Sequence, residues 1–87
     1  MRFKEDVIFS FEEDANKLTI FKSEGSKLVV ISGAMAHFFA KTENQAAVDF
    51  DEFKVKFSRD FSAHDAVEVD RLFSKIKKTF LENELIS

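Results

Sequence analysis

The chain contains no cysteine, no proline, no tryptophan and no tyrosine, and it has only two glycines. Without cysteine it can form no disulfide and no thiolate metal site, and it has no cysteine nucleophile. Without proline, nothing interrupts a long helix. No apolar run approaches the roughly 20 residues of a membrane span, and the first residues do not resemble a signal peptide. We therefore expect a cytoplasmic protein that does not associate with membranes.

What the chain does contain is typical of one small globular domain covering residues 1–87. Twelve phenylalanines provide all of its aromatic side chains, and most of them should be buried because a phenyl ring has no polar group. The hydrophobic fraction of 45% and the charged fraction of 33% are ordinary for a folded domain. The net charge of −3 argues against nucleic acid as a partner, since phosphate binding needs a basic surface.

Three segments in the first part of the chain have the composition and the period-two alternation of β-strands. They cover Val7–Glu12, Lys17–Lys22 and Lys27–Ser32. The two connections, 13–16 and 23–26, are short and rich in turn residues, and Asn16 is suited to a left-handed conformation. Short connections predict an antiparallel meander.

Helical periodicity begins after the third strand. Gly33–Lys41 is the first predicted helix, with Ser32 as its N-cap and an apolar side made of Met35, Phe38 and Phe39. The second, Phe50–Arg59, has a capping-box pattern at Asp49 and Glu52, and Val48 and Phe53 occupy the hydrophobic-staple positions. Its apolar series is Phe50, Phe53 and Phe57.

The third predicted helix is the longest and spans approximately Ala63–Asn83. Ser62 with Asp65 forms a second capping pattern at its start. Its apolar series is Ala66, Val69, Phe73, Ile76 and Phe80, and the apolar pair Leu85-Ile86 follows it. The predicted order is β-β-β-α-α-α, which is an α+β, winged-helix-like fold.

No motif for catalysis, metal binding or cofactor binding is present. His37 and His64 are far apart and in no metal-ligand spacing, so ordinary surface roles suit them best. Gly25 and Gly33 form no phosphate-binding loop, and the carboxylates are scattered over turns and helix starts. We expect a protein that is not an enzyme, holds no cofactor and works by binding.

The third strand, KLVVIS, has four consecutive apolar residues. Leu28 and Val30 should point to one face of the sheet and Val29 and Ile31 to the other. Such a run predicts a strand with both faces covered, and one interpretation is that it belongs to the ordinary core. The alternative is an edge strand, since it carries neither charge nor proline to block pairing, and it would then accept a peptide as a fourth strand. The same edge could also pair with a second copy of the chain.

The third helix carries a basic stripe of Arg71, Lys75 and Lys78, with Lys77 beside it. This stripe is either a binding surface for an acidic partner or an ordinary solvated face, because it lies almost opposite the apolar series and shares its side with acidic residues. The flank that holds Leu72 and Thr79 borders the core and could form the wall of a groove. The other flank, which holds Asp70, Lys77 and Leu81, also borders the core and could form the wall of a groove.

These segments resemble the PqqD-like proteins, which are leader-peptide recognition domains for ribosomally made, modified peptides. The resemblance covers approximately Lys17–Ile86 and rests on VVISGAMAHFF, VDFDEFKVKF and VDRLFSKIKKTFLENELI. The chain departs from the family pattern at Ser32 and Glu84, and Asp70 matches only loosely the acidic residue near the start of the last helix.

The resemblance implies a chaperone-like role in which the leader of a precursor peptide adds to the third strand. A separate enzyme (a radical-SAM protein, a cyclase or a peptidase) would then modify the peptide. The implied peptide-binding residues lie in the third strand and the third helix: Leu28, Val29, Val30, Ile31, Arg71, Leu72, Lys75, Lys78 and Thr79. Two other functions stay open, a winged-helix regulator that binds nucleic acid and a small structural or inhibitory subunit.

Overall fold

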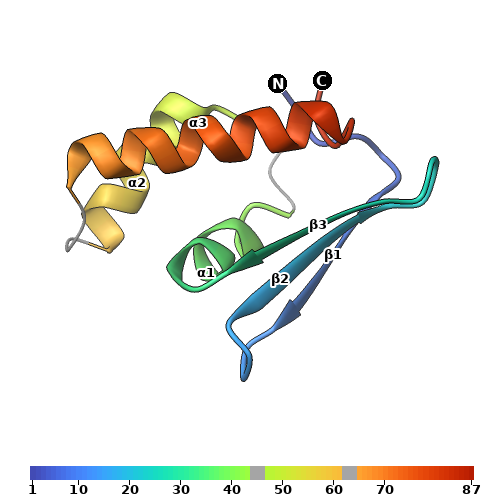
Figure 1. Cartoon of the computed structure of the whole chain (residues 1–87), viewed down its shortest axis with the longest axis horizontal. Helices are drawn as coiled ribbons and strands as arrows, with labels where there is room; N and C mark the ends of the chain where they lie inside the picture. The colour runs from blue at the N-terminus through green and yellow to red at the C-terminus, as the bar shows by residue number, and fades with distance from the viewer. Residues whose placement is uncertain (44–46, 62–64) are drawn as a thin grey trace.

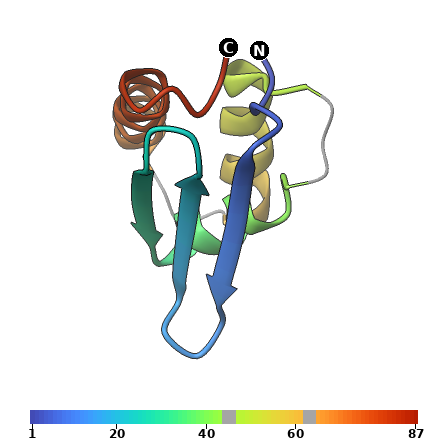
Figure 2. The ribbon, with the colours of Figure 1, turned by 90° about the vertical axis from the view of Figure 1, so that its right-hand side faces the viewer.

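The computed structural model describes residues 1–43, 47–61 and 65–87, and it has a three-stranded antiparallel sheet followed by three helices (Figure 1). The strands are β1 (Val7–Glu12), β2 (Lys17–Lys22) and β3 (Lys27–Ser32). The predicted bounds of all three strands are confirmed. The sheet order is β1-β2-β3, so β2 is central and β1 and β3 form the two edges (Figure 2).

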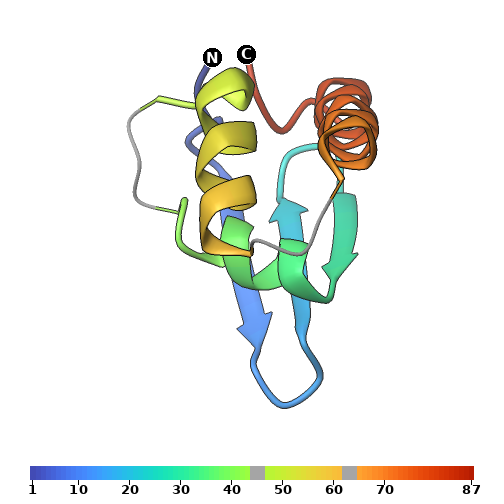
Figure 3. The ribbon, with the colours of Figure 1, turned by 90° about the vertical axis from the view of Figure 1, so that its left-hand side faces the viewer.

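The three helices lie on one side of the sheet (Figure 3). They are α1 (Ala34–Ala40), α2 (Phe50–Asp60) and α3 (Ala66–Glu82). Helix α1 is next to the sheet, and α2 and α3 pack against each other farther away. The predicted α+β class and the order β-β-β-α-α-α are therefore confirmed.

The core is built mainly from phenylalanine rings. Seven of the twelve are buried, and they come from α1, α2 and α3: Phe38, Phe39, Phe50, Phe53, Phe57, Phe73 and Phe80. Phe39 touches the rings of Phe38, Phe53 and Phe80 at centroid distances of 5.4, 5.9 and 5.5 Å. Edge-to-face pairs of this kind add to the area that the rings bury. The predicted apolar faces of the helices thus meet in a single core.

Residues near the start and the end of the described chain pair with each other, which the sequence did not predict. Phe3 forms an antiparallel bridge with Ile86. Arg2 and Ser87 exchange backbone hydrogen bonds of 2.9 and 3.0 Å, and the N–H of Lys4 donates to the carbonyl of Leu85 at 3.0 Å. The two ends lie side by side in Figure 2. This pairing holds the buried residues Leu85 and Ile86 over the core.

An ion pair between the partly exposed Asp6 and the buried Lys22 joins the first residues of the chain to the sheet. Lys22 is only 4% exposed, and its ammonium lies 3.4 Å from a carboxylate oxygen of Asp6. The same ammonium donates to the carbonyl of Glu24 at 3.0 Å, and the N–H of Glu24 donates to Asp6 at 3.0 Å. Because buried charges are stable only when they are paired and hydrogen-bonded, these contacts explain how a lysine occupies an inward position of β2.

Two of the predicted helix starts are wrong. Helix α1 begins at Ala34 with Gly33 as its N-cap at φ 70°, and no side chain caps it, so Ser32 does not have the predicted role. Helix α3 begins at Ala66 with Asp65 as its N-cap, which accepts a hydrogen bond from the N–H of Val67 at 2.7 Å. Ser62, Ala63 and His64, which the sequence placed at the start of this helix, lie outside the described residues.

The start of α2 is confirmed. Asp49 is its N-cap, and its carboxylate accepts from the N–H groups of Asp51 and Glu52 at 3.0 and 3.2 Å. Val48 and Phe53 are both buried, as the staple positions require. The Glu52 side chain forms an ion pair with Lys56 at 2.7 Å.

Candidate functional site

The edge of the sheet at β3 is open, and the register shows which of its backbone groups are available. In the part of the chain that the structure describes, no strand pairs with β3 on the side away from β2. The N–H of Gly33 donates to the carbonyl of Asn16 at 2.9 Å, which fixes the phase of the β2–β3 ladder. Because hydrogen-bonded positions alternate in an antiparallel pair, Val29 and Ile31 direct their backbone groups to β2. The N–H and C=O groups of Leu28, Val30 and Ser32 therefore point to the open edge.

The two faces of β3 differ in how well they are covered. Val29 and Ile31 are buried on the face toward the helices, whereas Leu28 and Val30 are 55% and 52% exposed on the opposite face. The predicted division of these four side chains between the faces is confirmed. The prediction that both faces are covered is wrong, because all three helices lie on one side of the sheet.

A groove of about 310 Å³ lies between β3 and α3, which we call the β3–α3 groove. It is lined by four residues of β3, one of α1 and five of α3: Val29, Val30, Ile31, Ser32, Met35, Leu72, Lys75, Ile76, Thr79 and Phe80. Most of these side chains are apolar. The groove therefore offers an apolar surface directly beside the open backbone groups of the edge strand.

The polar side chains that line the groove are Ser32 of β3 and Lys75 and Thr79 of α3. The hydroxyl of Thr79 donates to the carbonyl of Lys75 at 2.9 Å, so it is partly satisfied within the helix. Lys75 is exposed, and among the described residues no carboxylate lies within 4 Å of its ammonium. A cation without a partner at the rim of an apolar groove favours a ligand that carries a carboxylate.

Six of the nine residues that the sequence assigned to peptide binding line this groove. They are Val29, Val30, Ile31, Leu72, Lys75 and Thr79. Leu28 belongs to the same edge but points to the outer face of the sheet. Arg71 and Lys78 are exposed on α3 and do not line the groove, and Lys78 lies 3.9 Å from Glu82.

Four further residues line the groove that the sequence did not assign to it: Ser32, Met35, Ile76 and Phe80. The helical pattern placed Met35, Ile76 and Phe80 on the apolar sides of their helices, which was correct. A pattern within one helix does not show where that apolar side leaves the packed core and borders a groove.

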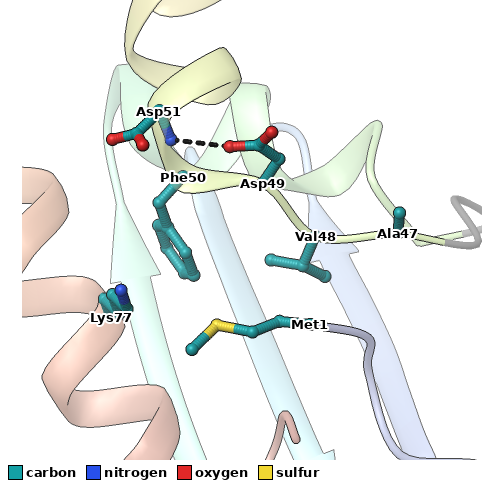
Figure 4. Close-up of a pocket in the computed structure, with 7 residues that line it drawn as sticks. All are labelled: Met1, Ala47, Val48, Asp49, Phe50, Asp51 and Lys77. Atoms are coloured by element: carbon teal, nitrogen blue, oxygen red, sulfur yellow. Dashed lines mark hydrogen bonds between the residues drawn. The ribbon is translucent and has the colours of Figure 1, made fainter.

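Two other cavities are lined by different residues. The cavity in Figure 4 has a volume of about 420 Å³, and the side chains of Met1, Val48 and Phe50 gather in it, with Lys77 approaching from α3. Its carboxylate Asp49 already accepts the hydrogen bond from Asp51 that caps α2. A third cavity of about 380 Å³ lies between α2 and α3. Neither cavity adjoins an open strand edge.

An ion pair between α2 and α3 defines the side of α3 that faces away from the groove. The ammonium of Lys54 donates to the carboxylate of Asp70 at 2.6 Å, and this hydrogen bond raises the pKa of Lys54. Asp70 is therefore engaged with α2 and is not part of the β3–α3 groove. The flank with Asp70 and Lys77, predicted as a second possible groove wall, lines the other two cavities instead.

The histidines and carboxylates form no chemical centre among the described residues. Nε2 of His37 lies 2.6 Å from Oδ1 of Asn16, and the His37 ring packs edge-to-face on Phe11 at 5.0 Å. This half-buried histidine ties α1 to the β1–β2 turn, where Asn16 has the predicted positive φ of 48°. The described residues include no group of three or more side chains that could hold a metal ion, and none of their helices is long and apolar enough to cross a bilayer.

Comparison of the chain with protein families, with curated proteins and with solved structures found no match in any of the three. The candidate site thus depends on the geometry of β3 and α3 alone.

Proposed function

We propose that this protein is a non-catalytic, cytoplasmic peptide-binding domain that captures an extended peptide as a fourth strand of its sheet. The observation that carries the proposal is the open edge of β3 beside the apolar β3–α3 groove. An added strand gains main-chain hydrogen bonds from Leu28, Val30 and Ser32, and the groove takes up alternate side chains. This combination gives affinity through the backbone and selectivity through the groove.

Most of the open edge strand lacks the features that normally prevent strand addition, and its one charged residue, Lys27, stands at the start of the strand. Natural edge strands carry charges, prolines or bulges that block pairing with another chain, and the four residues Leu28–Ile31 have none of these. At the other edge, β1 ends in Glu12 and is followed by Glu13 and Asp14. An unprotected edge strand promotes aggregation, because its free backbone groups can pair with other chains. A role in peptide binding would explain why the protein has such an edge.

The charge near the groove favours an acidic peptide. Lys75 lines the groove without an ion-pair partner among the described residues, and Arg71 is exposed one turn earlier on α3. A carboxylate in the ligand would bring opposite charges together at the rim, which raises the association rate and fixes the register.

We further propose that the captured peptide is the leader of a ribosomal precursor peptide, presented to a separate modifying enzyme such as a radical-SAM protein, a cyclase or a peptidase. The resemblance of VVISGAMAHFF and of the last helix to the PqqD-like proteins supports this narrower proposal. The position of the groove, between the third strand and the third helix, agrees with the site that the resemblance implies.

Nucleic-acid binding is the weaker candidate. The net charge is −3, and the exposed side of α3 that carries Arg71 and Lys78 also carries Glu68 and Glu82. A duplex-binding protein would show a retarded complex at low ionic strength that dissociates steeply as salt is added. Such a result would favour the regulator over the peptide-binding domain.

Amide shift mapping with peptides tests the proposal. Short random peptides displayed on phage are selected on the protein, and an enriched peptide is synthesised and titrated into the isotope-labelled protein. The amide signals of Leu28, Val30 and Ser32 should shift together with those of Leu72 and Thr79. No enrichment, or shifts confined to Arg71, Lys75 and Lys78 with β3 unchanged, would show that strand addition is wrong.

The leader assignment has its own experiment. The probe is the short precursor peptide encoded beside the gene of this protein, prepared in full and without its leader. The full precursor should bind and the truncated one should not. Equal binding of both forms would overturn the leader assignment while leaving peptide capture intact.

A further inference from the structure

The outer face of the sheet carries an apolar row that ends at the open edge. Ile8 of β1 is paired directly with Phe21 of β2, and Phe21 is paired directly with Leu28 of β3. Val30 continues the apolar surface along β3. At the far end of the strands the corresponding row is polar, because Glu12 pairs with Lys17 and Lys17 with Ser32. The apolar row therefore crosses the sheet from β1 and reaches the open edge at Leu28, and Val30 adds a second exposed apolar side chain on the strand where a fourth strand would be added.

A strand that adds to β3 must place side chains on both faces of the sheet. Residues directly opposite each other in neighbouring strands share a face, so the ligand residue opposite Val30 lies on the outer face. Its two neighbours in the ligand then point to the inner face, toward Met35, Leu72 and Ile76 of the groove. The groove thus determines only every second residue of the ligand.

We propose that Leu28 and Val30 determine the alternate ligand residues, those that point to the outer face of the sheet. The ligand is then a segment with apolar side chains at consecutive positions and carboxylates outside that run. This inference rests on the proposed peptide-binding function and specifies its ligand class. Leu28 and Val30 are more than half exposed, and only a side chain on the outer face of the added strand can cover them from the side of the open edge. A polar side chain there would leave both uncovered, whereas an apolar one forms favourable cross-strand pairs.

The charges of α3 favour such a peptide over a second copy of the chain. Two copies joined antiparallel through β3 would be related by a two-fold axis perpendicular to the sheet. Both α3 helices would then lie on the same side of the joined sheet, each carrying Lys75 at the rim of its groove beside the junction. Like charges would face each other there, while a peptide with carboxylates would neutralise them.

Peptide selection on two forms of the protein tests the inference. Random displayed peptides are selected on the wild-type protein and on the double variant Leu28→Ser/Val30→Thr, which keeps every backbone N–H group of the edge. Wild-type protein should enrich peptides with consecutive apolar residues. The double variant should enrich peptides that are apolar only at alternate positions, because it keeps the groove residues Met35, Leu72 and Ile76 that face the inward side chains of the ligand.

Affinity measurements with one synthesised wild-type-selected peptide provide the quantitative result. The double variant should bind it about threefold to tenfold more weakly, which corresponds to the loss of two cross-strand apolar pairs. Ile8→Ser is the matched control, because Ile8 is 56% exposed on the same face but lies on β1, away from the added strand. This control should bind as tightly as the wild-type protein.

Three results would contradict the inference, and they are distinguishable. If wild-type protein enriches peptides that alternate apolar and polar residues and still shift the β3 amides, the outer-face rule is wrong but peptide capture stands. If nothing is enriched, the proposed function fails and the inference fails with it. If the wild-type protein sediments as a dimer and the double variant as a monomer, a second copy covers these residues instead.

Discussion

Val30 and Thr19 face each other across the β2–β3 pair, at a position where the backbone groups of β3 point away from β2. Val29 and Ile20 face each other one residue earlier, where the groups of β3 point toward β2. Two adjacent valines of one strand thus have opposite roles in the backbone. Val29 pairs its backbone groups with β2, and the N–H of Val30 points to the open edge.

Proline substitutions at these two positions should therefore have different results. Val30→Pro removes an N–H that no described residue uses, so the protein should fold but lose affinity for an edge-binding peptide. Val29→Pro removes a donor of the β2–β3 ladder at a buried position and should unfold the domain. Circular dichroism measures folding, and calorimetric titration with a selected peptide measures binding.

Val30→Thr is the control for the first substitution, because it keeps the N–H and the β-branched shape. It should bind at least several times more tightly than Val30→Pro. Strand addition would be excluded if Val30→Pro folds and binds the peptide with wild-type affinity.

Reversing the charge of Lys75 should weaken the binding of an acidic peptide. We expect Lys75→Glu to lower the affinity by about threefold to tenfold at low salt, because one attractive pair becomes repulsive. Lys77→Glu makes the same change in net charge on the same helix, but Lys77 lines the cavity of Figure 4 and not the β3–α3 groove. It should have a much smaller effect. Equal losses for both variants would mean that only the overall charge matters.

The phenylalanine core should be sensitive at its centre. Phe39 is fully buried between rings of all three helices, so Phe39→Ala should lower the free energy of unfolding by about 3–5 kcal/mol. Domains are stable by roughly 5–15 kcal/mol, so this single change should leave little of the total. Urea denaturation measures both values.

Phe11→Ala is the matched control for the core substitution. Phe11 is exposed on β1 and packs on His37, so its loss should cost only about 1 kcal/mol. Equal costs for Phe39→Ala and Phe11→Ala would contradict the placement of the core.

The stability of the protein should fall at acid pH partly because of Asp6. The hydrogen bond from the N–H of Glu24 and the nearby ammonium of Lys22 lower the pKa of Asp6 below its ordinary value of 3.8. The folded state therefore holds this proton less readily than the unfolded state. The stabilisation is present above pH 3.8 and is lost as the pH falls from there through the lowered pKa.

The variant Asp6→Asn isolates this contribution. It should be less stable than the wild-type protein at neutral pH, because the buried Lys22 loses its ion-pair partner. Its free energy of unfolding should then change less between neutral pH and pH values below 3.8. Parallel pH curves for the two proteins, measured by urea denaturation, would show that Asp6 does not contribute.

Local patterns predicted the elements of this fold because strand and helix periodicities are properties of neighbouring residues. The alternation in Lys27–Ser32 correctly divided Leu28 and Val30 from Val29 and Ile31. The spacing of Phe50, Phe53 and Phe57 correctly identified the buried side of α2. Period two also gives Lys22 the same orientation as Leu18 and Ile20, but its partner Asp6 is distant in the sequence, so the alternation by itself does not explain its burial.

Helix starts were predicted less well. Ser32 has the side chain of an N-cap, yet Gly33 takes that position, because the ladder bond from its N–H to Asn16 continues the strand pairing past Ser32. The geometry of the sheet thus overrides the local preference. At Asp49 nothing competes with the cap, and the local pattern was correct.

By itself, the sequence determined the three strands, the three helices, their order and the inward sides that form the phenylalanine core, since each depends on the spacing of nearby residues. Only the tertiary structure decided that β3 is an open edge with one uncovered face, and that Met35, Ile76 and Phe80 border a groove beside it. The reason is that a groove exists where elements fail to close on each other. Here the separation between β3 and α3 depends on how α3 packs on the whole core, including the pairing of Phe3 with Ile86.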